Sequence, residues 1–290
     1  MSWFVVERSF TPKGSGLGED RFAVVEDELG VSAIVVADGV TDKSGRVYGE
    51  RTGGALAAEC AIAVVRRLGE DAVPDRAVTA ITAELAALRR TWGLDDGDPV
   101  APAAVVAVVL PRRRIVWRVG DVHLAIRDGH GHWRHHRGDP PLDRVVAGVR
   151  AAYLQCLLAE GHPPDELARD DPGRRLVLPL LEKQARLAND EKAGPFGYGV
   201  FDGRPVPARF VEVFSLDGAE EVVVASDGYL SAAETLAAAE ERLARSLAAD
   251  PLRIGDHPAT KAVAPGAAGF DDRTYLRVKK LVRQAGEGDG

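Results

Sequence analysis

Short runs of apolar residues, each bounded by turn-forming residues, recur along the chain and predict β-strands. The predicted strands cover residues 22–26, 31–37, 103–110, 115–119, 122–126, 210–214, 221–225 and 274–278. A polar turn at residues 27–30 joins the first two strands, and charged or glycine-containing turns separate the three runs between residues 103 and 126. This pattern indicates antiparallel hairpins and a meander.

Helical spacing of apolar residues separates these groups of strands. Helices are predicted at residues 48–68 and 75–92, around residues 145–156, at residues 176–188 and after Leu230. The apolar positions that define the first three are Leu56, Cys60, Val64 and Leu68, then Val78, Ile81, Leu85, Leu88 and Trp92, then Val145, Val149, Ala152, Tyr153 and Cys156. The last helix is predicted to open with a capping box formed by Ser231 and Glu234.

The order of these elements favours a single domain. Strands, a helix pair, strands, a second helix pair, strands, one helix and a last strand follow one another, with no internal repeat and no dividing linker. We therefore expect one α+β domain over residues 1–283, with packed sheets and helices outside, and a disordered tail at residues 284–290. The stretch 194–208 is rich in glycine, proline and aromatic residues and predicts a loop region near a functional site.

Composition narrows the class of protein. Of the 290 residues, 46% are hydrophobic and 28% charged, as in an ordinary globular chain. The net charge of −7 disfavours a nucleic-acid or membrane partner, since either would need a large basic surface. Cys60 and Cys156 lie in helix-like stretches, so neither a disulfide scaffold nor a cysteine zinc site is expected. The first residues do not resemble a targeting signal, and the apolar run 101–110 is too short to cross a bilayer, which predicts a cytoplasmic protein.

Acidic residues fall repeatedly at the ends of predicted strands. These positions are Glu19-Asp20 before one strand, Asp38-Gly39, Gly120-Asp121 and Asp227-Gly228 after three others, and Asp271-Asp272 before the last. Taken singly, each is a common turn or a solvated strand edge. If the strand ends meet at one edge, the carboxylates repel one another in a small volume unless divalent cations neutralise them.

The kind of cation follows from the ligand atoms. Oxygen ligands favour Mg²⁺ or Mn²⁺ over zinc. A glycine after the aspartate also has a physical use, because without a Cβ the carbonyl of Gly39 can approach a metal ion closely.

In this order, the motifs resemble those of the type 2C metal-dependent protein phosphatases. They are Glu19-Asp20, Val36-Ala37-Asp38-Gly39, Val119-Gly120-Asp121, Ala225-Ser226-Asp227-Gly228 and Asp271-Asp272-Arg273-Thr274. The resemblance covers about residues 4–279. It implies a four-layer α/β/β/α sandwich with two central antiparallel sheets, and a bacterial-type hydrolase of phosphoserine and phosphothreonine in proteins.

The resemblance also implies a role for each matching residue. Asp38 would bridge two metal ions, and the carbonyl of Gly39 would ligate one of them. Asp227 and Asp271 would ligate the other ion. Asp38 and Asp227 are thus the residues expected to matter most for catalysis.

The remaining acidic residues would support this centre. Glu19 would act through metal-bound water with Asp20 beside it, and Asp121 would share a third, weaker ion with Asp227. The implied cofactors are two or three Mn²⁺ or Mg²⁺ ions, which activate a bridging hydroxide for in-line attack on phosphorus. The expected partners are a phosphoprotein substrate and a cognate serine/threonine kinase.

Residues on the substrate side depart from the family's pattern. Val40-Thr41-Asp42 follows the first Asp-Gly where the family often has histidine, so no general acid is assigned. Ser15 stands where the family has its phosphate-binding arginine. Lys13 is the candidate replacement, although it lacks the bidentate fork of arginine. Asp272 replaces an asparagine, and no family motif is found between residues 130 and 208.

Two other functions stay open. A catalytically weak relative serving as a regulatory or binding module fits the missing arginine, although such a module has no reason to keep several repelling carboxylates. A metal-dependent hydrolase of small or nucleic-acid phosphate esters is disfavoured by the acidic charge.

Two further clusters have simpler interpretations. The histidine-rich segment 129–136 could bind a transition metal, but we interpret it as a hairpin turn and the following strand. Residues 112–114, all arginine, could dock a phosphoprotein, but we interpret them as a solvated turn.

Overall fold

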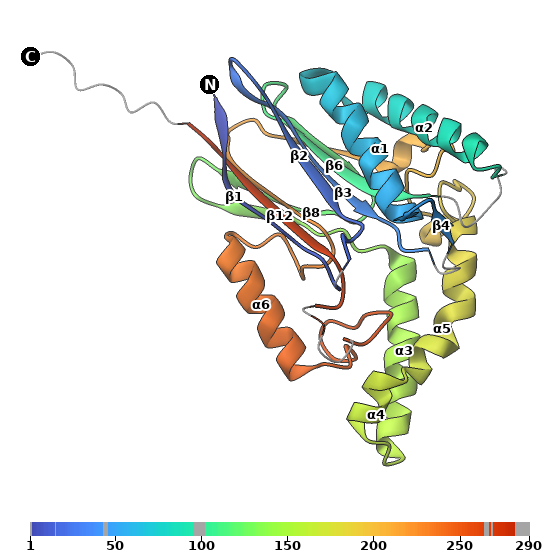
Figure 1. Ribbon diagram of the computed structural model, residues 1–290. Coiled ribbons are helices and arrows are strands. Elements are labelled where there is room, and N and C mark those ends of the chain that lie inside the picture. The colour runs from blue at the N-terminus through green and yellow to red at the C-terminus, as the bar shows by residue number, and fades with distance from the viewer. Residues whose placement is uncertain are drawn as a thin grey trace, which may run out of the picture.

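Two five-stranded antiparallel sheets face each other in the computed structural model, which describes residues 2–14, 16–42, 46–94, 102–263, 267 and 269–281 (Figure 1). The first sheet contains, in spatial order, β1 (Trp3–Thr11), β12 (Arg273–Lys280), β11 (Ala219–Ala225), β8 (His123–Asp128) and β9 (Trp133–His136). The second contains β10 (Val211–Ser215), β7 (Ile115–Val119), β6 (Ala104–Leu110), β3 (Gly30–Gly39) and β2 (Arg21–Asp27). A small hairpin of β4 (Val47–Tyr48) and β5 (Arg51–Thr52) precedes the first helix.

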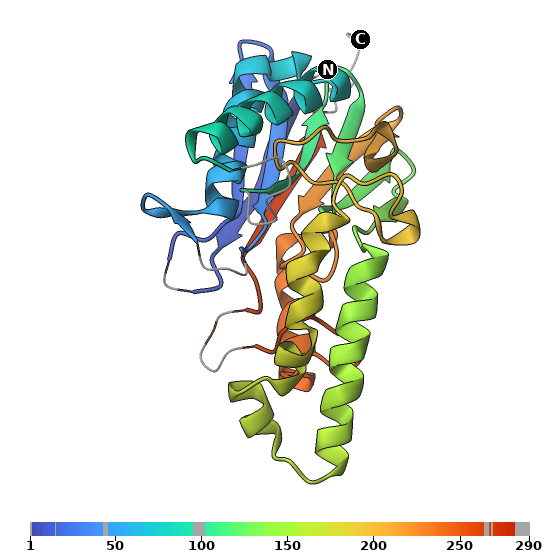
Figure 2. The same cartoon turned by 90° about the vertical axis from the view of Figure 1, so that its right-hand side faces the viewer.

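Helices cover both outer faces of this pair of sheets. They are α1 (Gly53–Leu68), α2 (Pro74–Thr91), α3 (Pro141–Ala159), α4 (Pro164–Arg169), α5 (Pro172–Lys183) and α6 (Leu236–Ala249). Helices α1 and α2 lie over the second sheet and α6 over the first (Figure 1). Helices α3 and α5 run side by side and extend past the end of the sheets, with α4 near their far end (Figure 2). No described helix is long and apolar enough to cross a bilayer.

Three apolar layers confirm the α+β class and the four-layer arrangement. Val35 of β3 packs toward α1 and α2, whereas its neighbour Val36 packs between the two sheets. On the other sheet, Val224 of β11 faces the inter-sheet core and Val223 faces α6. Since side chains alternate along a strand, a strand buried on both faces must be apolar at every position. This is why the central strands appear in the sequence as unbroken apolar runs.

The helix predicted at residues 176–188 is observed as α5 at Pro172–Lys183, and α4 was not predicted. Three further differences concern how a helix begins or which face it buries. The first helix begins at Gly53 rather than at residue 48, because the preceding residues pair as the hairpin β4–β5 and the side chain of Thr52 accepts a hydrogen bond from the Ala55 amide. The predicted capping box of Ser231 and Glu234 is wrong, because the helix does not begin there. Helix α6 begins at Leu236, and the side chain of Thr235 accepts from the Ala238 amide at its start.

The third difference concerns α3. The structure confirms a helix there, but Val145, Val149 and Tyr153, which predicted it, lie on its exposed face. Its buried positions include Leu142, Val146 and Leu154, which pack against α5 and the loops beyond it.

Candidate metal centre

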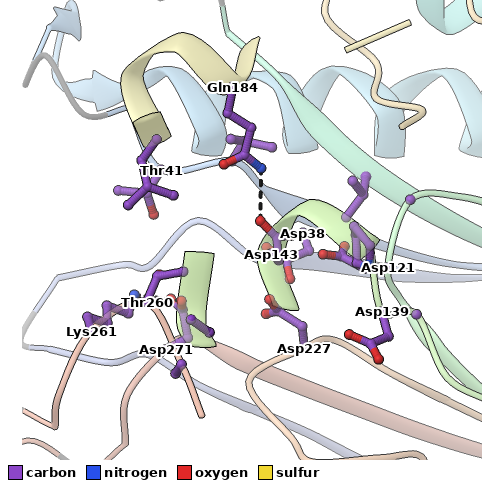
Figure 3. Close-up of a pocket in the computed structure, with 18 of the residues that line it drawn as sticks. Asp38, Thr41, Asp121, Asp139, Asp143, Gln184, Asp227, Thr260, Lys261 and Asp271 are labelled. Carbon is purple, nitrogen blue, oxygen red and sulfur yellow. Dashed lines mark hydrogen bonds and ion pairs between the residues drawn. The ribbon is translucent and has the colours of Figure 1, made fainter. Parts of the chain in front are cut away.

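The ends of the strands that carry the acidic motifs meet at one end of the sandwich. Asp38 lies on β3, Asp121 between β7 and β8, Asp227 just after β11 and Asp271 just before β12. All four side chains line one cavity of about 1020 Å³. In Figure 3, the carboxyl groups of Asp38, Asp121 and Asp227 gather on one side of this cavity, and Asp271 lies beside Lys261. The convergence predicted from the sequence is therefore present.

Three of these carboxyl groups repel one another without a basic partner. Burial, together with the charges of Asp20, Asp227 and Asp121, raises the pKa of Asp38 well above its ordinary value. Burial and the charges of Asp121 and Asp271 do the same for Asp227. Burial first, and then the charge of Asp143, raises the pKa of Asp121 to about 6. Within the described residues, none of the three forms an ion pair.

Asp20 ties the two sheets together beneath this group. Its Oδ2 accepts hydrogen bonds from Ser226 Oγ at 2.7 Å and from Thr274 Oγ1 at 2.8 Å. Ser226 Oγ in turn accepts from the Thr274 amide at 2.8 Å. Burial raises the pKa of Asp20 to about 6, although both hydroxyl donors favour its ionised form. Its fixed position supports Asp38, with which it interacts.

Glu19 has one satisfied and one unsatisfied oxygen. Its Oε2 accepts from Thr41 Oγ1 at 2.5 Å and from Lys13 Nζ at 3.4 Å. Its Oε1 is buried and has no hydrogen-bond partner among the described residues. A Cβ placed on Gly54 would lie 2.9 Å from this oxygen and 2.9 Å from the carbonyl oxygen of Gly39. The two acceptors therefore border the same small space.

Asp272, which stands where the resembled family has an asparagine, fixes the backbone of a neighbouring loop. Its Oδ1 accepts from the Lys13 amide at 2.7 Å, and its Oδ2 accepts from the Glu19 amide at 2.6 Å. In an asparagine one of these two positions would be the side-chain NH2 group, which donates and would face a backbone N–H that also donates. Asp272 thus fixes the loop between β1 and β2 that carries Lys13 and Glu19.

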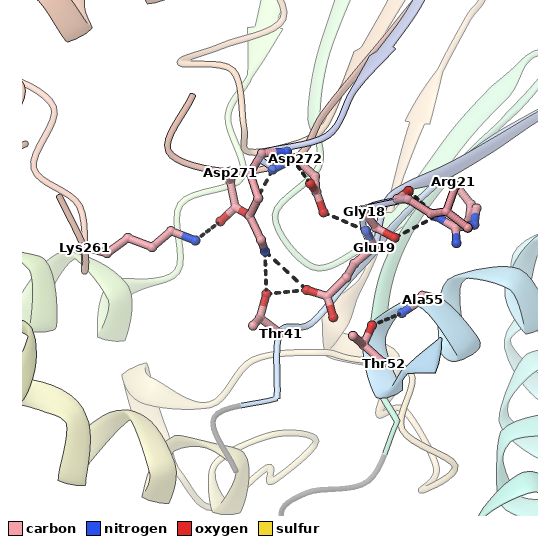
Figure 4. Close-up of polar contacts among 11 residues, drawn as sticks. Gly18, Glu19, Arg21, Thr41, Thr52, Ala55, Lys261, Asp271 and Asp272 are labelled. Atoms are coloured by element: carbon pink, nitrogen blue, oxygen red, sulfur yellow. Dashed lines mark hydrogen bonds and ion pairs between the residues drawn. The ribbon is translucent and has the colours of Figure 1, made fainter. Parts of the chain in front are cut away.

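Lys13 lies within the acidic group rather than at its rim. Its ammonium group contacts Glu19 Oε2, Thr41 Oγ1 at 3.1 Å and Asp271 Oδ1 at 3.2 Å. The labelled side chains of Glu19, Thr41 and Asp271 lie close together in Figure 4. Burial opposes the charged form of Lys13, but the charges of Asp271 and Glu19 raise its pKa overall. Its predicted role in substrate binding stays a prediction. Ser15, the position of the family's arginine, lies outside the described residues.

The donor set fits a hard cation. It consists of carboxylate and carbonyl oxygens, of which Glu19 Oε1 and Asp20 Oδ1 are buried and have no hydrogen-bond partner in the part of the chain that the structure describes. Among the described residues, no three acidic, histidine or cysteine side chains already stand at the distances that would enclose one ion. Repulsion within such a group is relieved when a cation enters it.

His123 lies two residues after Asp121 in the sequence and lines the same cavity, but it is not suited to act as the general acid. Its Nδ1 accepts from the Gly138 amide at 3.0 Å. Burial lowers its pKa to about 4, so the ring is neutral at neutral pH. The general acid therefore stays unassigned.

Asp143, at the start of α3, was missed by sequence reasoning. It lines the cavity, its charge contributes to the raised pKa of Asp121, and its Oδ1 accepts from Gln184 Nε2 at 2.9 Å (Figure 3). In the sequence it follows two prolines, a context typical of a helix start, where an acidic residue needs no functional explanation. The loop region predicted at residues 194–208 does line the cavity, through Tyr198, Val200 and Asp202 among others.

The two other clusters have the simpler structures expected of them. The histidine-rich segment forms the turn between β8 and β9 together with β9 itself. Arg112 pairs with Asp27, and Arg113 with Asp71, in the turn before β7. These arginines are already engaged by neighbouring carboxylates, as in an ordinary solvated turn.

Gly54→Ala tests the close approach beside Glu19. The new Cβ would lie 2.8–2.9 Å from the backbone carbonyl of Gly39 as well as from Glu19 Oε1, and the carbonyl cannot move without shifting β3. We expect a loss of about 1–3 kcal/mol in unfolding free energy and weaker Mn²⁺ binding. Chemical denaturation and calorimetry measure the two effects.

Gly148→Ala is the matched control. Gly148 lies on the exposed face of α3, and no atom lies within 4 Å of a Cβ placed on it. Because alanine has the higher helix propensity, the substitution should raise the free energy of unfolding by about 0.5–1 kcal/mol. Equal effects of the two substitutions would contradict the steric explanation.

Comparison with known proteins gives matches in structure but none in sequence. No known protein family and no curated protein matches the sequence. The Mycobacterium tuberculosis serine/threonine phosphatase PstP/Ppp is 14% identical, with 97% of this chain and 99% of that chain covered and a TM-score of 0.49. The catalytic domain of PstP in complex with two manganese ions is 15% identical, with coverages of 96% and 97% and a TM-score of 0.49.

Serine/threonine phosphatase Stp1 from Staphylococcus aureus is 12% identical, with 95% of each chain covered and a TM-score of 0.48. All of these are serine/threonine phosphatases, the class that the sequence motifs resemble. At these identities and TM-scores the similarities decide nothing about the activity of this chain, which has to be argued from its own residues.

Proposed function

We propose that the chain is a metal-dependent phosphatase that hydrolyses phosphoserine and phosphothreonine in proteins. The observation that carries this proposal is the meeting of Asp38, Asp121 and Asp227, from separate strand ends, in one cavity without a basic partner among the described residues. Burying several like charges together lowers the stability of a fold, so their presence favours a role in binding cations.

The carboxylates of Asp38, Asp121 and Asp227 and the carbonyl of Gly39 would hold Mn²⁺ or Mg²⁺. A bound cation of this kind polarises phosphoryl oxygens and lowers the pKa of a water molecule, so that a hydroxide nucleophile is available at neutral pH. Asp20 holds the strand ends in register through Ser226 and Thr274, which keeps the ligands preorganised.

Basic side chains also line the cavity and supply positive charge for a phosphate ester. They include Arg137, Arg174 and Arg253. Arg174 is half-buried, donates from Nη1 to the Thr260 carbonyl at 3.0 Å and forms no ion pair within the described residues. Its remaining guanidinium donors suit phosphate oxygens. The cavity of about 1020 Å³ is large enough to admit a phosphorylated segment of a protein as well as a small ester.

The test is hydrolysis of a phosphothreonine peptide and of an aryl phosphate, with Mn²⁺, with Mg²⁺ and with chelator. We expect turnover of the peptide that depends on the metal ion, stops in chelator and returns when the ion is restored. Turnover of the small ester alone would instead favour a small-molecule hydrolase. A protein that binds neither metal ion nor phosphopeptide would contradict the proposal.

A second function is favoured by one observation. Glu19 and Asp271, which the family resemblance assigns to the metal centre, both contact lysines of the chain itself. This arrangement fits a regulatory module that binds a phosphoprotein and hydrolyses it slowly or not at all. Phosphopeptide binding without turnover, measured in saturating Mn²⁺, would favour this module over the phosphatase.

A further inference from the structure

Both carboxylate oxygens of Asp271 are bound by lysines of the chain. Asp271 Oδ1 accepts from Lys13 Nζ at 3.2 Å, and Asp271 Oδ2 accepts from Lys261 Nζ at 2.6 Å (Figure 4). The side chains of the two lysines are 33% and 30% exposed and that of Asp271 is 25% exposed, so the contacts are partly shielded from water. Metal ligation at Asp271 would have to compete with two ammonium groups.

All three N–H donors of the Lys13 ammonium group have an acceptor. An ammonium group has three N–H bonds. Lys13 directs them at Glu19 Oε2, Thr41 Oγ1 and Asp271 Oδ1, while its backbone amide is fixed by Asp272. The contacts join three separate parts of the chain around one positive charge, which is the arrangement expected of a bound cation.

Lys261 is held by the residues on both sides of it. The Ala259 carbonyl accepts from Arg150 Nη1 at 3.0 Å, and the Thr260 carbonyl accepts from Arg174 Nη1 at 3.0 Å. The Ala262 amide donates to Asp171 Oδ2 at 3.0 Å. The backbone that carries Lys261 is therefore fixed to α3 and α5, and the ammonium group reaches Asp271 without a mobile loop having to order first.

The charges divide the acidic group into two halves. Glu19 and Asp271 contribute two negative charges, which Lys13 and Lys261 balance. The other half, Asp38 with Asp121 and Asp227, has no such counter-charge among the described ion pairs. An external cation thus gains most in the second half and is repelled from the first.

We propose that Lys13 and Lys261 take the place of one metal ion, so that the centre binds a single divalent cation, at Asp38, Asp121 and Asp227. This inference rests on the proposed function, since it concerns the metal centre of that activity. It differs from the two or three ions that the family resemblance implies. In this protein Asp271 acts as the partner of two lysines and not as a metal ligand.

The test is the number of Mn²⁺ ions bound per chain, by calorimetry and by metal analysis of the isolated complex. We expect one ion in the wild-type protein and two in the double variant Lys13→Met, Lys261→Met. The Mn²⁺ electron paramagnetic resonance spectrum should change from that of an isolated ion to that of a coupled pair. The control, Lys192→Met with Lys280→Met, loses the same charge away from the cavity and should keep one ion.

Two bound ions in the wild-type protein, or one in the folded double variant, would overturn the inference. Should the double variant not fold, as judged by circular dichroism, the wild-type stoichiometry and the single variants decide the question. Failure of the proposed function looks different, because it is the absence of metal-dependent turnover whatever the stoichiometry. Two ions together with turnover would leave the phosphatase standing and remove only the role of the lysines.

Discussion

Asp38→Asn should abolish metal-dependent turnover while making the metal-free protein more stable. Turnover is expected to fall by about 10³-fold or more, because Asp38 is the carboxylate that faces Asp20, Asp121 and Asp227 at once and no other residue can take its place in holding the cation. Stability should rise because asparagine removes a buried charge that its neighbours repel.

The gain in stability should depend on pH in a defined direction. The pKa of Asp38 in the folded protein lies well above its ordinary value of 3.8, so the folded state binds a proton more tightly than the unfolded state does. Stability of the wild-type protein without metal therefore falls as pH rises from about 4 toward the folded pKa. The advantage of the asparagine variant should be small at pH 4 and about 1–3 kcal/mol at pH 7, by denaturation in chelator.

Asp217→Asn is the matched control for this substitution. Asp217 lies in an exposed turn with a side chain 71% exposed, and the partners of this side chain among the described residues are the exposed Arg114 and Ser215. The free energy of unfolding should change by no more than about 0.5 kcal/mol, and the turnover rate by no more than about twofold. An Asp38→Asn variant that keeps wild-type turnover would remove the basis of the proposed metal centre.

The sequence predicts the acidic half of the centre because each of its aspartates is marked by local pattern. Asp38 and Asp227 end unbroken apolar runs, and such runs belong to central strands whose ends must lie at an edge of a sheet. No comparable local pattern marks the contact between the lysines and Asp271. The family resemblance assigned Asp271 to the metal ions and Lys13 to the substrate, but the two residues are 258 positions apart and no local pattern predicts that they pair.

The same distinction between local and distant information explains the errors in secondary structure. Strand β1 was missed because its short apolar start, residues 3–6, is followed directly by charged Glu7 and Arg8. It lies at an edge of the first sheet, and of its residues only Trp3 is buried. Helix α1 packs on the second sheet mainly through small residues such as Ala57 and Ala61, and of its predicted apolar positions only Val64 is buried. Close approach of a helix to a sheet selects alanine, which carries almost no periodic hydrophobic signal.

Arg150→Met should be the most destabilising substitution outside the metal centre, at about 3–5 kcal/mol. The Arg150 side chain is fully buried and donates to both oxygens of Asp171 and to the carbonyls of Leu252, Arg253 and Ala259. Methionine fills similar space but removes all of the guanidinium donors, so that Asp171 keeps the amides of Arg174 and Ala262 but loses its buried counter-charge. Denaturant unfolding measures the loss, and amide exchange at residues 252–262 should quicken because Arg150 fixes that loop to α3.

Arg175→Met distinguishes this effect from the loss of any arginine in the same region. Arg175 is one helix position beyond Arg174 and pairs with Asp170, but the two side chains are 60% and 79% exposed. Exposed pairs of this kind contribute about 0–1 kcal/mol, so stability and amide exchange should barely change. Because Arg150 also fixes the backbone beside Lys261, its loss should weaken the lysine contact with Asp271 and favour a second Mn²⁺ ion. An Arg150→Met variant as stable as Arg175→Met would show that the buried pair does not hold this loop.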